Sequence, residues 1–92
     1  MRDEDFEWDD ENAVSNFAKH CVTFEHARTA FDDPGSVDRD DHDSSEGRYK
    51  RLCRLGVEVL VVIWTERGDR VRIISARKAT KHEQRSYYQD QA

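Results

Sequence analysis

An arginine and a lysine, Arg77 and Lys78, stand where a strand is expected to end and a helix to begin. Charged groups at the end of a buried strand are held more firmly than charged groups in a loop. The planar guanidinium of Arg77 matches two oxygens of one phosphate group, whereas Lys78 offers a point charge. This pair therefore predicts a site for an anionic ligand, although a lysine at a strand end is often only solvated.

Four residues elsewhere carry groups suited to proton transfer or stacking. Lys19 and His20 end the first predicted helix, where cations suit the negative end of the helix dipole, and this placement alone would explain both. His20 also has an ordinary pKa of about 6.5, which suits proton transfer. Tyr87 and Tyr88 either stack on nucleic-acid bases or pack the last helix on the sheet.

A long apolar stretch, residues 57–79, must position these groups. Residues 57–65 are apolar on both faces, which predicts a central strand covered on both sides. Turn formers at 66–69 lead into a second strand at 70–76, and a third strand at 48–54 precedes the hairpin. Three residues of the second strand share one face: Val71, Ile73 and Ser75.

The helices are predicted from capping residues and apolar spacing. Asp9 or Asp10 caps a helix with one apolar stripe of the kind that packs on a core; it contains Val14, Phe17, Ala18 and Cys21. Thr23 begins a second short helix, with three apolar residues on one face: Phe24, Ala27 and Phe31. Thr80 and Glu83 fit a capping box at the start of the last helix.

These elements make an α+β domain, a small antiparallel sheet with helices packed on it, in the order β-α-α-β-β-β-α. Residues 6–8 form a short edge strand. Residues 36–46 are polar and acidic and are predicted to be a mobile loop, with at most a brief strand at its start. We expect one domain over 1–92, with an acidic extension at 1–5 and a polar tail at 89–92.

The charge is divided between the halves of the chain. Residues 1–46 carry 15 Asp or Glu and 4 Lys or Arg, whereas residues 47–92 carry 5 and 11. This division suggests a basic surface for an anionic ligand, unless the two halves neutralise each other in the fold.

Several protein classes are not expected. Cys21 and Cys53 form neither a disulfide framework nor a CxxC site. The apolar run is shorter than a membrane helix, and the acidic N-terminus has no signal-peptide core, so we expect a cytoplasmic protein. The Asp and His residues of 36–46 match no ligand spacing, and we expect no metal and no cofactor.

Five segments, in this order and spacing, resemble the BrnT family, the toxins of type II toxin–antitoxin pairs. They are FEWD at 6–9, N-x-x-K-H at 16–20, E-x-R at 46–48, VVIWTER at 61–67 and RIISARKA at 72–79. The resemblance runs from about residue 6 to residue 88. Three residues depart from it: Asn12 stands where lysine is common, and Cys21 and Cys53 stand where glycine is expected. At Cys21, either the helix continues or a strained left-handed conformation is accepted.

The resemblance implies a RelE-like fold and metal-independent cleavage of RNA, which inhibits translation and growth. It also implies neutralisation by a BrnA-like ribbon-helix-helix antitoxin, and binding of promoter DNA only by the toxin–antitoxin complex. The alternative is a non-catalytic module that only engages a protein partner.

Metal-independent cleavage uses attack by the 2′-hydroxyl of RNA on the adjacent phosphorus, with proton transfer and charge stabilisation by the protein. We assign charge stabilisation to Arg77. Arg48 and Arg67 are expected to clamp flanking phosphates, although Arg67 is otherwise an ordinary turn residue. His20 and Glu46 compete for proton transfer, unless Glu46 only orients an arginine. Four residues are expected to contact RNA: Lys19, Lys78, Tyr87 and Tyr88.

Overall fold

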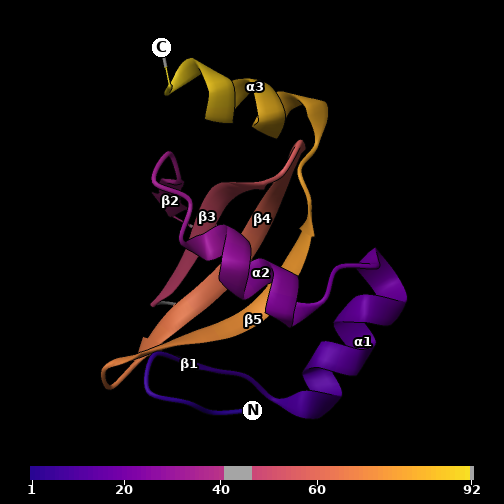
Figure 1. The fold of residues 1–92 in the computed structure, drawn as a ribbon, viewed down its shortest axis with the longest axis vertical. Helices are drawn as coiled ribbons and strands as arrows, with labels where there is room; N and C mark the ends of the chain where they lie inside the picture. Colours follow the sequence, from indigo (N-terminus) through magenta and orange to yellow (C-terminus); the bar gives the residue numbers. More distant parts are fainter. Residues whose placement is uncertain (41–46, 92) are drawn as a thin grey trace.

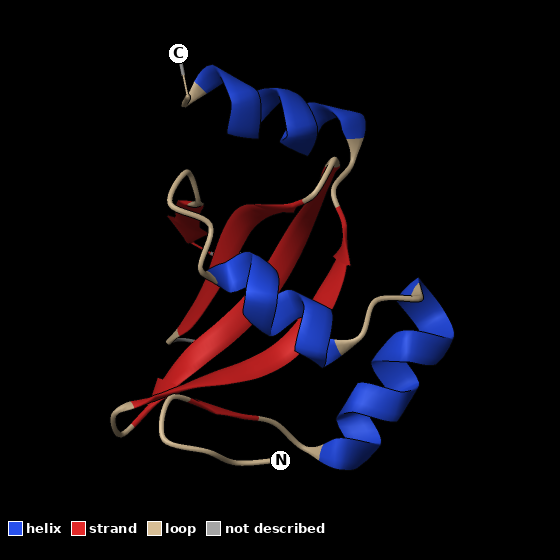
Figure 2. Ribbon diagram, in the orientation of Figure 1, coloured by secondary structure: helices blue, strands red, loops and turns tan. Residues whose placement is uncertain are grey.

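A five-stranded sheet in the order β1-β5-β4-β3-β2 forms the centre of the computed structural model, which describes residues 1–40 and 47–91. Figure 1 shows the elements in chain order: β1 (Phe6–Glu7), α1 (Asp10–His20), α2 (Phe24–Phe31), β2 (Val37–Asp40), β3 (Arg48–Leu55), β4 (Glu58–Arg67), β5 (Arg70–Lys78) and α3 (Lys81–Gln89). Only the β1–β5 pair is parallel among the strands described here. Figure 2 shows α2 across the sheet, α3 at one end and α1 beside β5. The predicted α+β class is confirmed.

The central position of the apolar strand is confirmed, because β4 lies between β3 and β5 in antiparallel pairing. The boundaries differ at both ends. Val57 lies in the preceding turn and is 93 % exposed. At the other end, Arg67 still pairs with Arg70, so the turn between β4 and β5 contains two residues and not the four predicted at 66–69. Gly68 in this turn has a φ of +59°.

The predicted element order lacks one strand. The brief strand considered at the start of the acidic loop exists as β2, which pairs with β3 through Val37 opposite Leu52. Both side chains are buried, at 8 % and 2 % exposure, and this burial holds the strand on the sheet. The remainder of the predicted loop, 41–46, lies outside the described residues.

Each face of the sheet has its own core. On the α2 side, the predicted apolar face of α2 packs with Trp64 and Ile73, and Phe31 meets the Trp64 ring edge-on at 5.2 Å. On the α3 side, Tyr87 of α3 packs with residues that include Leu52 and Val61. No helix in the described part of the chain is both long enough and apolar enough to cross a membrane.

An extra residue in β5 changes which side chains share a face. Ile63 of β4 pairs with Ser75, but the next residue, Trp64, pairs with Ile73, so Ile74 is inserted as a bulge. A bulge shifts the alternation of side chains by one residue. The prediction that Ser75 shares a face with Val71 and Ile73 was therefore wrong.

The predicted orientation of α1 was also wrong. Its apolar stripe faces outward: Val14 is 72 % exposed, Phe17 is 50 % exposed, and Ala18 and Cys21 are exposed as well. The buried residue of α1 is Asn16, at 6 % exposure.

The reason lies in what α1 covers. Asn16 Oδ1 accepts a hydrogen bond from Ala76 N at 3.1 Å, and its Nδ2 donates to Ala76 O at 2.8 Å. Asn12 Nδ2 donates to Ile74 O at 2.7 Å. The helix thus replaces a neighbouring strand along part of β5, and buried backbone groups there need polar partners.

The caps are those that the sequence predicts. Asp9 caps α1, Thr23 caps α2, and Thr80 and Glu83 form both halves of the capping box of α3. Cys21 follows α1 with φ of 57° and ψ of 24°, so the helix stops there and the left-handed conformation is accepted without glycine.

Candidate functional site

Basic residues gather on the sheet face that carries α3, and five of them lie along β4: four are opposite the stretch 61–65, and Arg67 is on β4 itself. Arg77 is opposite Val61, Lys50 is opposite Ile63, and Arg48 and Arg72 flank Thr65. Because alternate residues of β4 point to the same side, the cations aligned with 61, 63 and 65 share a face, as does Arg67 two residues on. We call this set the basic face: Arg48, Lys50, Arg67, Arg72 and Arg77. The predicted residues Arg48, Arg67 and Arg77 are thus brought onto one face.

Arg77 is held by a carboxylate from the start of α3. Its Nη1 and Nη2 donate to Glu83 Oε1 and Oε2 at 2.7 and 2.9 Å, a two-point contact that fixes the plane of the guanidinium. The same carboxylate accepts from the Thr80 amide at 2.8 Å and from Lys50 Nζ at 3.3 Å. The hydrogen bond from Arg77 is the main reason that the pKa of Glu83 lies far below its ordinary value.

A second group of arginines surrounds an open hollow of about 430 Å³ on the same face, lined by Arg48, Arg67, Arg72 and Thr65 among others. Arg72 Nη1 donates to Glu7 Oε2 at 2.7 Å, and Arg67 Nη1 lies 3.9 Å from the same oxygen. Glu7 is only 9 % exposed, so β1 supplies a buried anchor for these two guanidinium groups.

Two predicted RNA contacts are placed elsewhere. Lys78 lies opposite Leu60, on the other sheet face from Arg77, and its Nζ is 3.5 Å from Glu58 Oε1. Tyr87 is 3 % exposed and its hydroxyl donates to Asp33 Oδ2, so it packs the helix on the sheet and does not present a ring for stacking. Burial and this hydrogen bond raise the pKa of Tyr87 to about 12. Tyr88 is 45 % exposed, as stacking requires.

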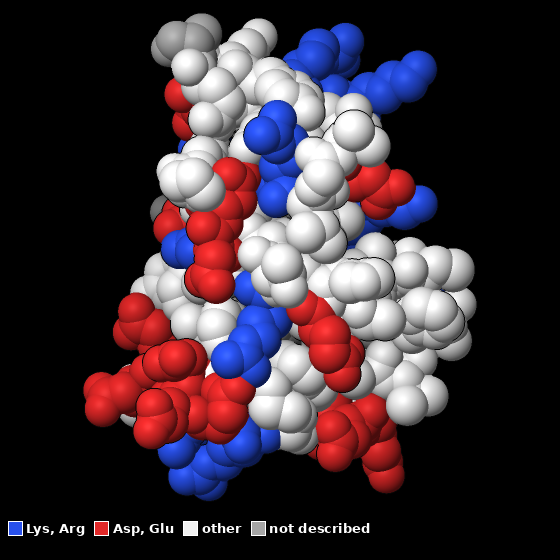
Figure 3. Space-filling model, viewed as in Figure 1, with Lys and Arg blue, Asp and Glu red and all other residues white. Residues whose placement is uncertain are grey.

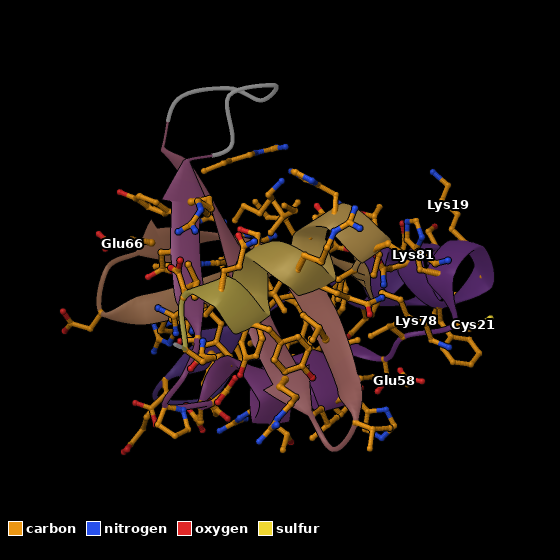
Figure 4. All side chains as sticks on the ribbon, turned by 90° about the horizontal axis from the view of Figure 1, so that it is seen from above. Lys19, Cys21, Glu58, Glu66, Lys78 and Lys81 are labelled. Carbon is orange, nitrogen blue, oxygen red and sulfur yellow. The ribbon has the colours of Figure 1, made fainter. Side chains whose placement is uncertain are left out.

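The proton-transfer candidates do not join the basic face by any contact within the described residues. Lys19 is exposed and His20 is half-buried at the end of α1. Figure 4 shows Lys19, Lys78 and Lys81 toward the same side of the molecule, and Glu66 toward the opposite side. Glu46 lies outside the described residues.

Sequence reasoning missed Glu83, Lys50 and Arg72 as members of the site. The capping box marked Glu83, but only as a cap. Arg72 is five residues from Arg77, an odd spacing that would separate them in a regular strand, and only the bulge at Ile74 brings them to one face.

Within residues 1–40 and 47–91, the two halves of the chain neutralise each other only in part. Ion pairs join Arg51 to Asp38 and Arg72 to Glu7 across the halves, whereas Arg48 has no ion pair with another described residue. Figure 3, which looks onto the side where α2 lies, shows Asp and Glu side chains gathered over the lower part of the molecule. Among the described residues, no His, Cys, Asp and Glu side chains are grouped as a metal ion would require.

An α+β domain with arginines gathered on one sheet face has the charge layout of a protein that binds a polyanion. Residues 8–83 match the family described as ribonuclease toxin, BrnT, of type II toxin-antitoxin systems. Because the match covers most of the chain, the chain belongs to this toxin family, whose members act in pairs with a cognate antitoxin. No curated protein matches the chain.

Proposed function

We propose that this toxin cleaves RNA without a metal ion, by attack of the substrate's own 2′-hydroxyl, at the basic face. The observation that carries the proposal is the position of Arg77. Its guanidinium is fixed by Glu83 at the boundary of β5 and α3, on the same face as the other cations of the basic face. Charge that develops on a phosphorane is stabilised most strongly by donors that are already oriented before the reaction.

In this proposal, Arg77 stabilises the extra charge on the phosphorane, and Arg48 and Arg67, which line one hollow, hold flanking phosphate on one side of the cut. Lys19 and Tyr88 are exposed and extend the contact with RNA. Lys78 and Tyr87 are left out because of their placement. His20 and Glu46 remain the two candidates for proton transfer.

The partner that we propose is a BrnA-like ribbon-helix-helix antitoxin. The complex with this antitoxin, and not the toxin alone, would bind promoter DNA. Inhibition of translation and growth in the cytoplasm would follow from RNA cleavage by the free toxin. The second candidate function, a module that binds its partner without cleaving RNA, is supported by the ion pair that already engages Arg77.

The test is cleavage of RNA by the purified toxin in EDTA, with analysis of the product ends. We expect a 2′,3′-cyclic phosphate and a 5′-hydroxyl, and an RNA with a 2′-O-methyl group at the cut site should be inert. Arg77→Ala should lower the rate by about 100-fold, the scale of removing one transition-state donor. Magnesium-dependent cleavage that leaves a 5′-phosphate would overturn the mechanism.

His20→Ala separates the two proton-transfer candidates in the same assay. A loss similar to that of Arg77→Ala assigns proton transfer to His20, and a small loss assigns it to Glu46. A toxin that cleaves no RNA and does not slow growth, yet binds its antitoxin, would favour the module.

A further inference from the structure

We propose that the hollow between Arg48, Arg67 and Arg72 is a second phosphate-binding site, which holds a backbone phosphate of RNA at a distance from the one at Arg77. The proposal rests on the proposed function, since it takes RNA as the ligand of the basic face. Arg72 is the new member of the site.

The chemistry of the lining points to a phosphate. Three guanidinium groups surround the hollow, whereas its carboxylates are Glu66 on the lining and Glu7 behind Arg72 and Arg67. Arginine forks bind phosphate oxygens in pairs. The volume of about 430 Å³ lies within the range of about 300–1,000 Å³ that is usual for small-ligand sites.

Arg72 is oriented before any ligand binds. Its side chain is 28 % exposed, and its Nη1 donates to the buried carboxylate of Glu7 at 2.7 Å. Glu7 is in turn fixed in β1, which pairs with β5 at this position. A guanidinium held from behind by a buried carboxylate loses little freedom when it binds a phosphate in front. Arg48 is exposed and has no ion pair with another described residue, so it is available to the same ligand.

The spacing of Arg72 and Arg77 along β5 favours an RNA strand, and not a single phosphate group, as the ligand of the basic face. Arg72 and Arg77 lie opposite Thr65 and Val61, which are four residues apart on β4, and this corresponds to about 13 Å at the usual rise of a strand. Because Glu7 holds Arg72 and Glu83 holds Arg77, one phosphate group does not bridge the two anchored guanidinium groups, whereas one RNA strand running along the basic face can contact both. The bulge at Ile74 places both arginines on that face.

The experiment measures binding of a fully 2′-O-methylated single-stranded RNA, which cannot be cleaved, by fluorescence anisotropy at several salt concentrations. Arg48→Ala should weaken binding and lower the slope of log Kd against log salt by about 0.7, the value for one lost contact with a single strand. Arg72→Lys keeps a charge beside Glu7, so that the fold is preserved, but loses the fork, and it should also weaken binding.

Arg85→Ala is the matched control, because it removes the same charge from an exposed position on α3 that does not line the hollow. Its salt slope should equal that of the unmodified toxin. Circular dichroism and thermal melting check that each variant is folded.

Wild-type affinity and slope in both Arg48→Ala and Arg72→Lys would overturn the proposal. The same holds if these variants bind RNA normally but lose affinity for the antitoxin, since the hollow would then serve the protein partner. Because this RNA cannot be cut, the result is independent of catalysis. A toxin that binds the methylated RNA in this manner but does not cleave unmodified RNA would refute only the proposed function.

Discussion

Glu83 takes part in two structures at once, the N-terminus of α3 and the anchoring of Arg77. Its carboxylate accepts hydrogen bonds from the Thr80 amide, from Lys50 and from both terminal nitrogens of Arg77. These contacts favour the ionised form and hold the pKa of Glu83 well below its ordinary value of 4.5. A carboxylate that resists protonation is a poor proton acceptor, so Glu83 is a positioning residue for Arg77.

We predict that Glu83→Gln lowers the rate of RNA cleavage and destabilises the fold by about 1–3 kcal/mol at neutral pH, the scale of hydrogen bonds to a charged group. Glutamine preserves the capping geometry but not the charge. Because the folded-state pKa of Glu83 is depressed, its stabilisation is present above the ordinary pKa and is lost as the pH falls through the folded value.

Urea unfolding of both proteins, at about pH 7 and about pH 3, measures this prediction. The stability difference should shrink in acid. Thr80→Ala is the control, since it removes the other half of the capping box without touching Arg77. A difference that stays constant with pH would contradict the assigned role of the charge.

At the residue scale, the sequence predicted the shared position of three arginines but not the face of every candidate side chain. Arg48, Arg67 and Arg77 lie on one sheet face, as expected. Lys78 does not, because neighbours in a strand point to opposite faces. Glu83 was identified as a cap, but its pairing with Arg77 depends on how α3 folds back, which local patterns do not encode.

At the element scale, α1 shows how a helix can bury its polar side. Periodicity predicted that Val14 and Phe17 face the core, as they would on a helix that covers the face of a sheet. Instead α1 lies along β5, where unpaired backbone groups need hydrogen-bond partners more than apolar cover. The amide of Asn16 offers a donor and an acceptor, which matches Ala76 on both sides.

We therefore predict a large loss of stability for one of two adjacent substitutions in α1 and a small loss for the other. Asn16→Ala should destabilise the protein by about 3 kcal/mol, because it leaves both backbone groups of Ala76 buried without these partners. Phe17→Ala should destabilise the protein by less than about 0.5 kcal/mol, because the Phe17 ring is half exposed and is not part of the buried core. Urea unfolding measures the stability of both variants. A larger loss of stability for Phe17→Ala than for Asn16→Ala would contradict the outward orientation of the apolar stripe of α1.

The strands were predicted more completely than the helix orientation. The central strand and its two neighbours followed from composition and turn residues, because a strand covered on both faces has few alternatives. The edge strand β2 was anticipated only as a brief strand at the start of the acidic loop, and the bulge was not predicted, since each depends on a partner strand that supplies register and burial.

At the scale of the whole molecule, charge separates the surface that we assign to RNA from the remainder. The described part of the acidic first half supplies partners to a few arginines, such as Glu7 to Arg72, whereas Arg48 has no ion pair with another described residue. The overall α+β class and the family were both predictable from sequence, because each prediction depends on many segments of the chain. An error in one short strand changes neither.

We predict that the antitoxin shields the basic face or closes the path to it. RNA cleavage by the toxin–antitoxin complex should therefore be much slower than cleavage by the free toxin at equal toxin concentration. The control is a mixture in which the antitoxin is replaced by an unrelated protein of similar charge. A complex that cleaves RNA as fast as the free toxin would contradict the prediction.

The bulge at Ile74 makes the length of β5 as important as its composition. Deleting this one residue would leave every arginine in the sequence, yet it would turn one end of the strand over relative to the other. Arg72 and Arg77 would then point away from each other, across the thickness of the sheet. Within this family, a gain or loss of one residue between these two arginines is thus a larger change than most substitutions, since it divides one ligand surface into two.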